Sequence, residues 1–346
     1  MANKRYIGYV GTYTKKTSKG VYRFELDLDK KELNNVQVAT ELDNPTYVTV
    51  SKNNKFLYAV SKEGDQGGVT SFSISETGEL KKLNSKASAG SPPCHVSVNS
   101  DNSLVVAANY HTKLVEAYTT ETDGSLIETA SAEHNGSGPH QRQEKPHLHY
   151  AGFTPDEKYV VVVDLGTDTV TSYQYTEGKL EEVAVLQTQA GSGPRHLVFH
   201  PNGEYAYVMT ELSNEVISLR YKGEGKFEEI QYLSAIPEDF TENSQGSAIH
   251  ISSDGKFVYA GNRGHNSIAV YKVEDDFTLS FVAWTDTEGD WPRDFVLDPS
   301  EQFVIASNQE SDTLVLFERD KENGTLTLIQ KDVKVPEPVC VKFLNQ

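Results

Sequence analysis

The sequence predicts an all-β fold, a seven-bladed β-propeller with four antiparallel strands in each blade. One pattern recurs six times: an apolar strand, a polar turn rich in Asn, Asp, Gly or Ser, and a returning strand of β-branched or aromatic residues. The six copies begin at Asn44, Pro92, His147, Gly193, Gln245 and Trp291. Their spacing of roughly 50 residues is typical of propeller repeats. Apolar residues alternate with period two, and helical periodicity is almost absent.

Each repeat also contains a third and a fourth strand. The third is seen in residues 214–222 (NEVISLRYK) and 266–274 (NSIAVYKVE), and the fourth in residues 226–236 (KFEEIQYLSAI). Each pair is joined by a short acidic or Gly-containing turn. Four consecutive antiparallel strands form one propeller blade, so each repeat is expected to be a blade.

The two ends of the chain predict how the ring closes. Residues 336–346 (PEPVCVKFLNQ) match a first strand, and residues 5–14 (RYIGYVGTYT) match a second. Residues 20–27 (GVYRFELD) and 33–42 (LNNVQVATEL) then supply a third and a fourth strand. Six complete units and one shared between the ends make seven blades, closed by pairing of the N- and C-terminal strands. Because no linker interrupts the repeats, one domain over residues 1–346 is expected.

The composition excludes several classes of protein. With 37% hydrophobic and 24% charged residues, the chain of 346 residues is expected to fold, and no apolar run is long enough to span a membrane. No signal-peptide pattern precedes the first strand, so a cytoplasmic location is expected. A formal net charge of −18 disfavours nucleic acid as a partner. Cys94 and Cys340 suggest neither a disulfide nor a zinc site. We expect a small-molecule ligand, no membrane partner, and a monomer or weak homo-oligomer.

Propeller geometry predicts which side chains meet. The first strand of a blade lines the central channel and the second returns antiparallel to it, so the start of the first and the end of the second lie at the same mouth. The first-strand starts are Thr46, Cys94, His149, Arg195, Ser247, Arg293 and Val339. The second-strand ends are Thr12, Ser61, Asn109, Asp164, Glu211, Asn262 with Arg263, and Asn308. Arg195 and Glu211 are thus expected to face each other at the channel rim.

If the Arg195–Glu211 ion pair were exposed, it would stabilise the fold by only a small amount, up to about 1 kcal/mol. Arg263 and Arg293 at the same rim favour a functional interpretation, because an acidic protein that gathers arginines in one place is expected to bind an anion. The long connections 133–149 and 236–246 overhang the same mouth. The first of them carries His140 and Arg142, which belong either to a lid or to a solvated loop.

The sequence leaves the choice of a catalytic histidine open. His147 and His149 both follow the long loop, whereas His95, His196 and His250 are interpreted as structural. Cys94 lies at a first-strand start, but no histidine–carboxylate pattern marks it as a nucleophile. The G-x-S-x-G elbow, the P-loop and the dinucleotide fingerprint are all absent, so no cofactor is expected.

Several motifs resemble those of the seven-bladed propeller lactonases, a family that includes the propeller-type 6-phosphogluconolactonases and the fungal carboxymuconate cycloisomerase. They are GSGPHQRQEKPHLH (136–149), GSGPRHLVFHPNGEYAYVMTEL (191–212), GNRGHNSIAVY (261–271) and GDWPRDFVLDPS (289–300). The resemblance covers essentially the whole chain. It implies a metal-independent, cofactor-free enzyme that opens a sugar lactone with the catalytic residues His147, Arg195, Glu211 and Arg263.

A mechanism follows as a hypothesis. Glu211 or His147 would take a proton from the attacking water, and Arg195 would stabilise the oxyanion. Arg263 and Arg293 would hold a phosphate, which makes 6-phospho-D-glucono-1,5-lactone the expected substrate. The further substrate-binding candidates are His149, Arg293, His140 and Arg142. Two alternatives stay open, a muconate-type cycloisomerase and a non-catalytic propeller that binds partners.

Overall fold

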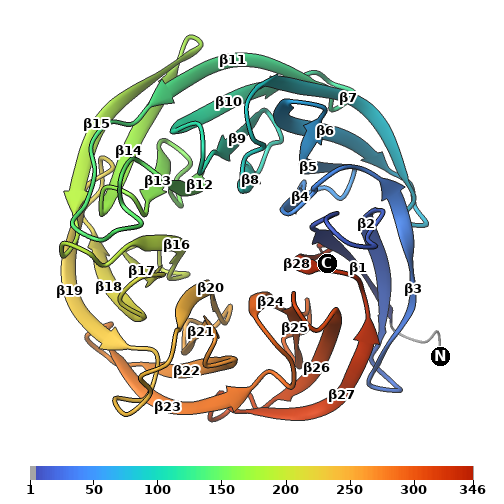
Figure 1. The fold of residues 1–346 in the computed structure, drawn as a ribbon, viewed down its shortest axis with the longest axis vertical. Helices are drawn as coiled ribbons and strands as arrows, with labels where there is room; N and C mark the ends of the chain where they lie inside the picture. The colour runs from blue at the N-terminus through green and yellow to red at the C-terminus, as the bar shows by residue number, and fades with distance from the viewer. Residues whose placement is uncertain (1–4, 346) are drawn as a thin grey trace.

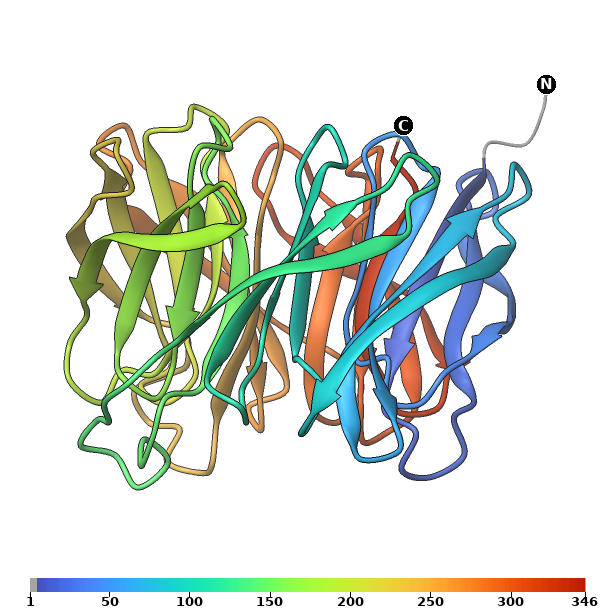
Figure 2. The ribbon, with the colours of Figure 1, turned by 90° about the horizontal axis from the view of Figure 1, so that it is seen from above.

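The computed structural model describes residues 5–345, which form seven four-stranded antiparallel sheets arranged in a ring (Figure 1). This confirms the predicted fold class. In every blade the first strand lies nearest the central axis and the fourth lies at the outer edge (Figure 1). Seen from the side, the strands run between the two faces of the disc, so the turns gather on those faces (Figure 2).

Six blades take their four strands in chain order from the channel outward, and the last strand of the chain completes the remaining blade. The first three blades contain β28 (Pro338–Phe343), β1 (Arg5–Thr12), β2 (Gly20–Asp27) and β3 (Glu32–Glu41); β4 (Val48–Val50), β5 (Phe56–Glu63), β6 (Gln66–Ile74) and β7 (Leu80–Ala89); and β8 (His95–Val98), β9 (Leu104–Ala108), β10 (Leu114–Thr120) and β11 (Leu126–Glu133). The fourth and fifth contain β12 (Leu148–Phe153), β13 (Val160–Asp164), β14 (Thr169–Thr176) and β15 (Lys179–Gln187); and β16 (Pro194–Phe199), β17 (Tyr205–Thr210), β18 (Glu215–Tyr221) and β19 (Phe227–Ser234). The sixth and seventh contain β20 (Gln245–Ile251), β21 (Phe257–Arg263), β22 (Ser267–Val273) and β23 (Leu279–Asp286); and β24 (Pro292–Leu297), β25 (Phe303–Asn308), β26 (Thr313–Arg319) and β27 (Leu326–Lys334).

The ring closes within the first of these sheets. β28 pairs antiparallel with β1, with Gly8 opposite Phe343 and Val10 opposite Val341. The last strand of the chain is therefore the innermost strand of the blade that the N-terminal strands begin, as predicted. The pairing removes an exposed edge from each of the two end strands.

The core lies between the blades. Second strands are buried on both faces, which is why β13 reads as an unbroken VVVVD with every residue buried. Val161 and Val163 of that strand pack against Leu197 and Val208 of the next blade. The outer strand β15, by contrast, alternates between exposed and half-buried residues. Within the described residues, a helix both long and apolar enough to cross a membrane is absent.

β-bulges interrupt several inner strands at the same point. The register shifts between Leu148 and Tyr150 in β12, between Pro194 and His196 in β16, and between Pro292 and Asp294 in β24. The extra residues are His149, Arg195 and Arg293. A bulge changes the direction in which the side chain of its extra residue points. The same irregularity therefore redirects one candidate site residue in each of these blades.

Candidate active site

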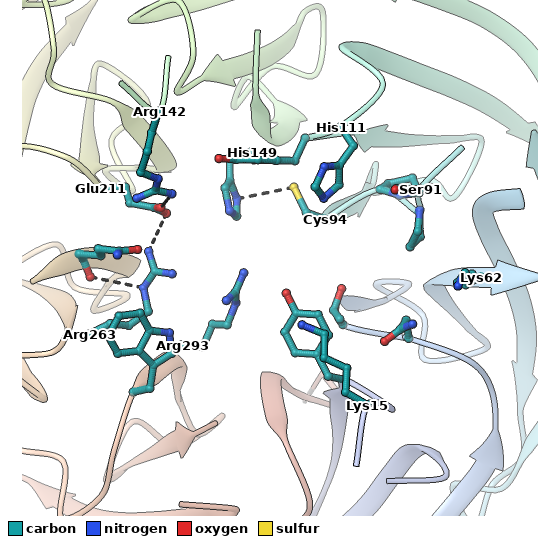
Figure 3. Close-up of a pocket in the computed structure, with 18 residues that line it drawn as sticks. Lys15, Lys62, Ser91, Cys94, His111, Arg142, His149, Glu211, Arg263 and Arg293 are labelled. Atoms are coloured by element: carbon teal, nitrogen blue, oxygen red, sulfur yellow. Dashed lines mark hydrogen bonds and ion pairs between the residues drawn. The ribbon is translucent and has the colours of Figure 1, made fainter. Parts of the chain in front are cut away.

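A cavity of about 500 Å³ opens at the mouth where the inner strands begin (Figure 3). Among the described residues, its lining includes one acidic residue, Glu211, and five basic residues: Lys15, Lys62, Arg142, Arg263 and Arg293. Arg195 lines a smaller cavity that shares Cys94, His149 and Arg293 with the first. A protein whose formal net charge is −18 thus carries an excess of positive charge around its central cavity.

Glu211 lies at the centre of an arginine cluster. Its Oε2 accepts from Arg195 Nε at 2.9 Å and pairs with Arg263 Nη2 at 2.6 Å, while its Oε1 accepts from Arg142 Nη2. Arg195, Glu211 and Arg263 are each no more than 3% exposed. The structure therefore brings together, at the predicted mouth, residues from two blades and the long loop (Figure 3). Such a buried cluster differs from an exposed surface pair, because its charges interact with little screening by water.

The cluster decides the protonation state of Glu211. Burial alone would raise the pKa of this carboxyl, but Arg263, Arg195 and Arg142 hold it well below its usual value. Glu211 is therefore ionised, and both of its oxygens already accept from guanidinium groups. Such a carboxylate is a weak proton acceptor, so the geometry favours a role in fixing the arginines over the predicted role as a base.

Two glycines allow the backbone to approach these side chains. Gly193 has φ of 60°, and its carbonyl accepts from the Glu211 amide at 2.7 Å. The carbonyl of Gly246 accepts from Arg263 Nη2 at 2.7 Å. A Cβ on Gly246 would lie 2.1 Å from the carbonyl oxygen of Thr210, so no larger residue fits without moving the strand.

Asp168 ties the Arg195 loop to the Arg142 loop. Its carboxylate accepts from the amides of Gly191 and Gly193 at 2.7 and 2.8 Å, and from Gln143 Nε2 at 2.7 Å. Gln143 is fully buried, so the segment carrying Arg142 is anchored to the protein. Sequence spacing offers no signal for Asp168 or Gln143, because their partners lie on loops.

His149 lines the cavity and His147 does not. His149 Nδ1 lies 3.7 Å from Cys94 Sγ, and burial lowers the pKa of this imidazole well below 6.5, so the ring is neutral. His147 Nδ1 instead donates to the carbonyl of Tyr110 at 2.9 Å, and its ring stacks on the Tyr110 ring at 4.1 Å. Between the two candidates, the structure places His149 in the position to contact a ligand and makes His147 a support for Tyr110.

The remaining predicted residues differ in their positions. Arg293 lines the cavity, donates to Gln309 Oε1 at 3.3 Å and lies over the ring of Tyr13 at 5.3 Å. His140 is not part of the lining; its Nδ1 accepts from the Arg142 amide at 3.1 Å and so shapes the loop. Burial raises the pKa of Cys94 to about 12, so the side chain stays a thiol. This agrees with the lack of a sequence pattern that would mark Cys94 as a nucleophile.

Lys15 and Lys62 line the cavity but were not among the predicted site residues. A signal for Lys62 was present in the repeat, because it follows Ser61 at a second-strand end as Arg263 follows Asn262. Lys15 lies in the connection after β1, where strand periodicity carries no information.

The family described as "Lactonase, 7-bladed beta-propeller" matches residues 7–343. The chain belongs to this lactonase family. Over 346 residues the lactonase is 56% identical to the 6-phosphogluconolactonase of Bacillus subtilis, with 99% of each chain covered. This membership confirms the expectation of a lactone-hydrolysing enzyme.

Solved structures agree with this membership. A protein from Lactobacillus plantarum superposes with a TM-score of 0.96 at 42% identity, covering 99% of the lactonase and 100% of that chain. A periplasmic gluconolactonase from Pseudomonas aeruginosa superposes with a TM-score of 0.94 at 30% identity, covering 99% of each chain.

The excess of basic residues predicts that anions stabilise the lactonase against heat. Millimolar phosphate or citrate should raise the Tm, because a ligand that binds only the folded state shifts the unfolding equilibrium. The measurement is a thermal melt in each anion beside sodium chloride of equal ionic strength. A Tm that follows ionic strength alone would contradict an anion site.

Proposed function

We propose that this lactonase hydrolyses 6-phospho-D-glucono-1,5-lactone to 6-phosphogluconate. The observation that carries the proposal is the lining of the cavity, which contains five basic residues and one acidic residue beside two histidines, His111 and His149. Such a lining suits a phosphorylated sugar better than a neutral one. The activity named for the Bacillus subtilis relative supports the same substrate.

His149 is the proposed base. The Cys94 thiol lies 3.3 Å from the carbonyl of Leu148, closer than the 3.7 Å to His149 Nδ1. We therefore infer that the thiol donates its hydrogen to that carbonyl. The imidazole hydrogen then lies on Nδ1 and is donated to the sulfur. This tautomer leaves Nε2 with a lone pair that can take a proton from the attacking water.

The arginine cluster is the proposed electrostatic element. Attack of water on the lactone carbonyl places negative charge on its oxygen, and guanidinium groups beside that oxygen stabilise the charge. Arg142 and Arg263 line the cavity, and Glu211 holds both in place. Collapse of the tetrahedral intermediate breaks the bond from the carbonyl carbon to the ring oxygen, and His149 returns its proton to that oxygen.

With this substrate, the reaction is a step of the pentose phosphate pathway. We propose a cytoplasmic location, supported by Cys94 and Cys340, which are both free cysteines. We also propose a monomer or a weak homo-oligomer, because the ring closes within one chain through the pairing of β1 with β28.

The direct test is the hydrolysis of freshly generated 6-phosphogluconolactone, followed by acid release against the spontaneous rate. We expect the purified protein to accelerate it in proportion to enzyme concentration. A muconate assayed in parallel addresses the cycloisomerase alternative. A rate equal to the spontaneous one would overturn the proposal, and turnover of the muconate would then favour the cycloisomerase alternative.

A further inference from the structure

The arginine cluster has few donors left for a phosphate. Arg195 gives Nε to Glu211 and Nη1 to the carbonyl of Ser247 at 2.7 Å. Arg263 gives Nη2 to Glu211 and to the carbonyl of Gly246, and Nε points to the carbonyl of Gln245 at 3.4 Å. Arg263 could make a two-pronged contact with a phosphate only by breaking these buried bonds, and Arg195 does not line the larger cavity. The phosphate is therefore expected away from Arg195 and Arg263.

Lys15 and Lys62 offer positive charge on the other side of the cavity from Glu211, Arg142 and Arg263 (Figure 3). Within residues 5–345, the ammonium group of Lys62 forms neither a hydrogen bond nor an ion pair, although the side chain is half-buried. The Lys15 ammonium lies 4.0 Å from the centre of the Tyr13 ring, and it has no acidic partner among residues 5–345.

Some surface lysines form ion pairs, such as Lys82 with Glu63 at 3.0 Å and Lys113 with Glu133 at 2.8 Å, while others in the described chain, such as Lys52, do not. What distinguishes Lys15 and Lys62 is that both line the cavity. Two lysines that face one cavity without a carboxylate leave their charge available to a ligand.

Neutral donors accompany these lysines. Ser91 and Asn44 also line the cavity. Within the described chain, the Ser91 hydroxyl and the Asn44 side-chain amide nitrogen make no hydrogen bond, whereas Asn44 Oδ1 accepts from the Thr14 amide at 3.2 Å. A phosphate has three terminal oxygens, and ammonium, hydroxyl and amide donors together can satisfy them.

We propose that Lys15 and Lys62, with Ser91 and Asn44, form the subsite that holds the phosphate of the substrate, and this inference rests on the proposed function. In 6-phosphogluconolactone the phosphate is several bonds away from the lactone carbonyl, so the two groups need separate parts of the cavity. The arginine cluster and His149 take the carbonyl, and the lysines take the phosphate.

The test compares the two lactones that differ only in the phosphate. For the wild type and for Lys15→Met/Lys62→Met, kcat/KM is measured with 6-phosphogluconolactone and with glucono-1,5-lactone. The ratio of the two values should fall at least about tenfold in the double variant, because two charge contacts to a dianion are lost. Lys52→Met, in the turn between β4 and β5, removes the same charge outside the cavity and should keep the wild-type ratio.

Calorimetric binding of 6-phosphogluconate and gluconate separates this inference from the proposed function. The wild type should prefer the phosphorylated acid, and the double variant should lose that preference. If the wild type hydrolyses neither lactone but prefers the phosphorylated acid, and the double variant loses that preference, the proposed function fails and the subsite stands. If the wild type is active and both the kinetic ratio and the binding preference survive in the double variant, the subsite is overturned.

Discussion

Replacing Glu211 with glutamine lowers kcat/KM for 6-phosphogluconolactone by about 100-fold or more, the size of loss seen when an oxyanion-stabilising group is removed. Glutamine keeps the shape of the side chain but removes the negative charge that holds Arg142, Arg195 and Arg263 together. The guanidinium groups then repel one another and leave the geometry needed to stabilise the transition state. Steady-state kinetics with freshly generated substrate measure the effect.

The same variant is expected to be less stable. Removing one partner of a buried ion pair costs about 3 kcal/mol or more, because the other charges stay buried without compensation. The lowered pKa of Glu211 means that its stabilising contribution is present above the ordinary carboxyl pKa of 4.5 and is lost as the pH falls through its lower folded value. The free energy of unfolding should therefore fall less steeply in acid for the variant than for the wild type.

Glu63→Gln is the matched control, since Glu63 forms an exposed ion pair with Lys82. It should leave kcat/KM and Tm almost unchanged. A Glu211→Gln protein that is folded and retains wild-type kcat/KM would show that the cluster is structural.

Replacing His149 with asparagine lowers kcat by about 100- to 10,000-fold, the range typical of losing a general base. The expectation follows from its place in the cavity lining and from the lone pair assigned to Nε2. Because the substrate contacts of the basic residues remain, KM should change much less than kcat. Single-turnover kinetics separate the chemical step from binding.

The comparison that decides between the histidines is His147→Asn. This variant loses the bond to the Tyr110 carbonyl and the stacking on its ring, so it should reduce stability more than kcat. A large loss of kcat in His147→Asn together with normal turnover in His149→Asn would reverse the assignment.

The pH profile gives an independent check. Since burial lowers the pKa of His149 well below 6.5, the base is already neutral at that pH, and the acid limb of kcat/KM should lie below it. An acid limb centred above pH 6.5 would point to a different group.

The sequence predicted the blade count, the ring closure and the meeting of Arg195, Glu211 and Arg263. These predictions succeed because period-two alternation and the polar turn at Asn202 and Gly203 set the register of two paired strands. Each residue is a fixed number of steps from a turn, so its position at the mouth follows from geometry.

Other features of the site could not be predicted in this way. His147 and His149 are two residues apart, so alternation places both on the same face of a strand. The bulge at His149 breaks that alternation, and nothing in the spacing marks it. Arg142 reaches Glu211 only because Gln143 is held by Asp168, a contact between loops that strand periodicity cannot encode.

The recurring bulges also affect how the enzyme could diversify. The residue at each bulge lines the central cavities, so its identity sets the shape and charge of the binding surface directly. His149, Arg195 and Arg293 are three such positions, and Ser247 occupies the irregular segment of β20. Substitutions around this one ring of sites would therefore change substrate preference, but at the buried positions His149 and Arg195 they would need compensating changes in neighbouring side chains.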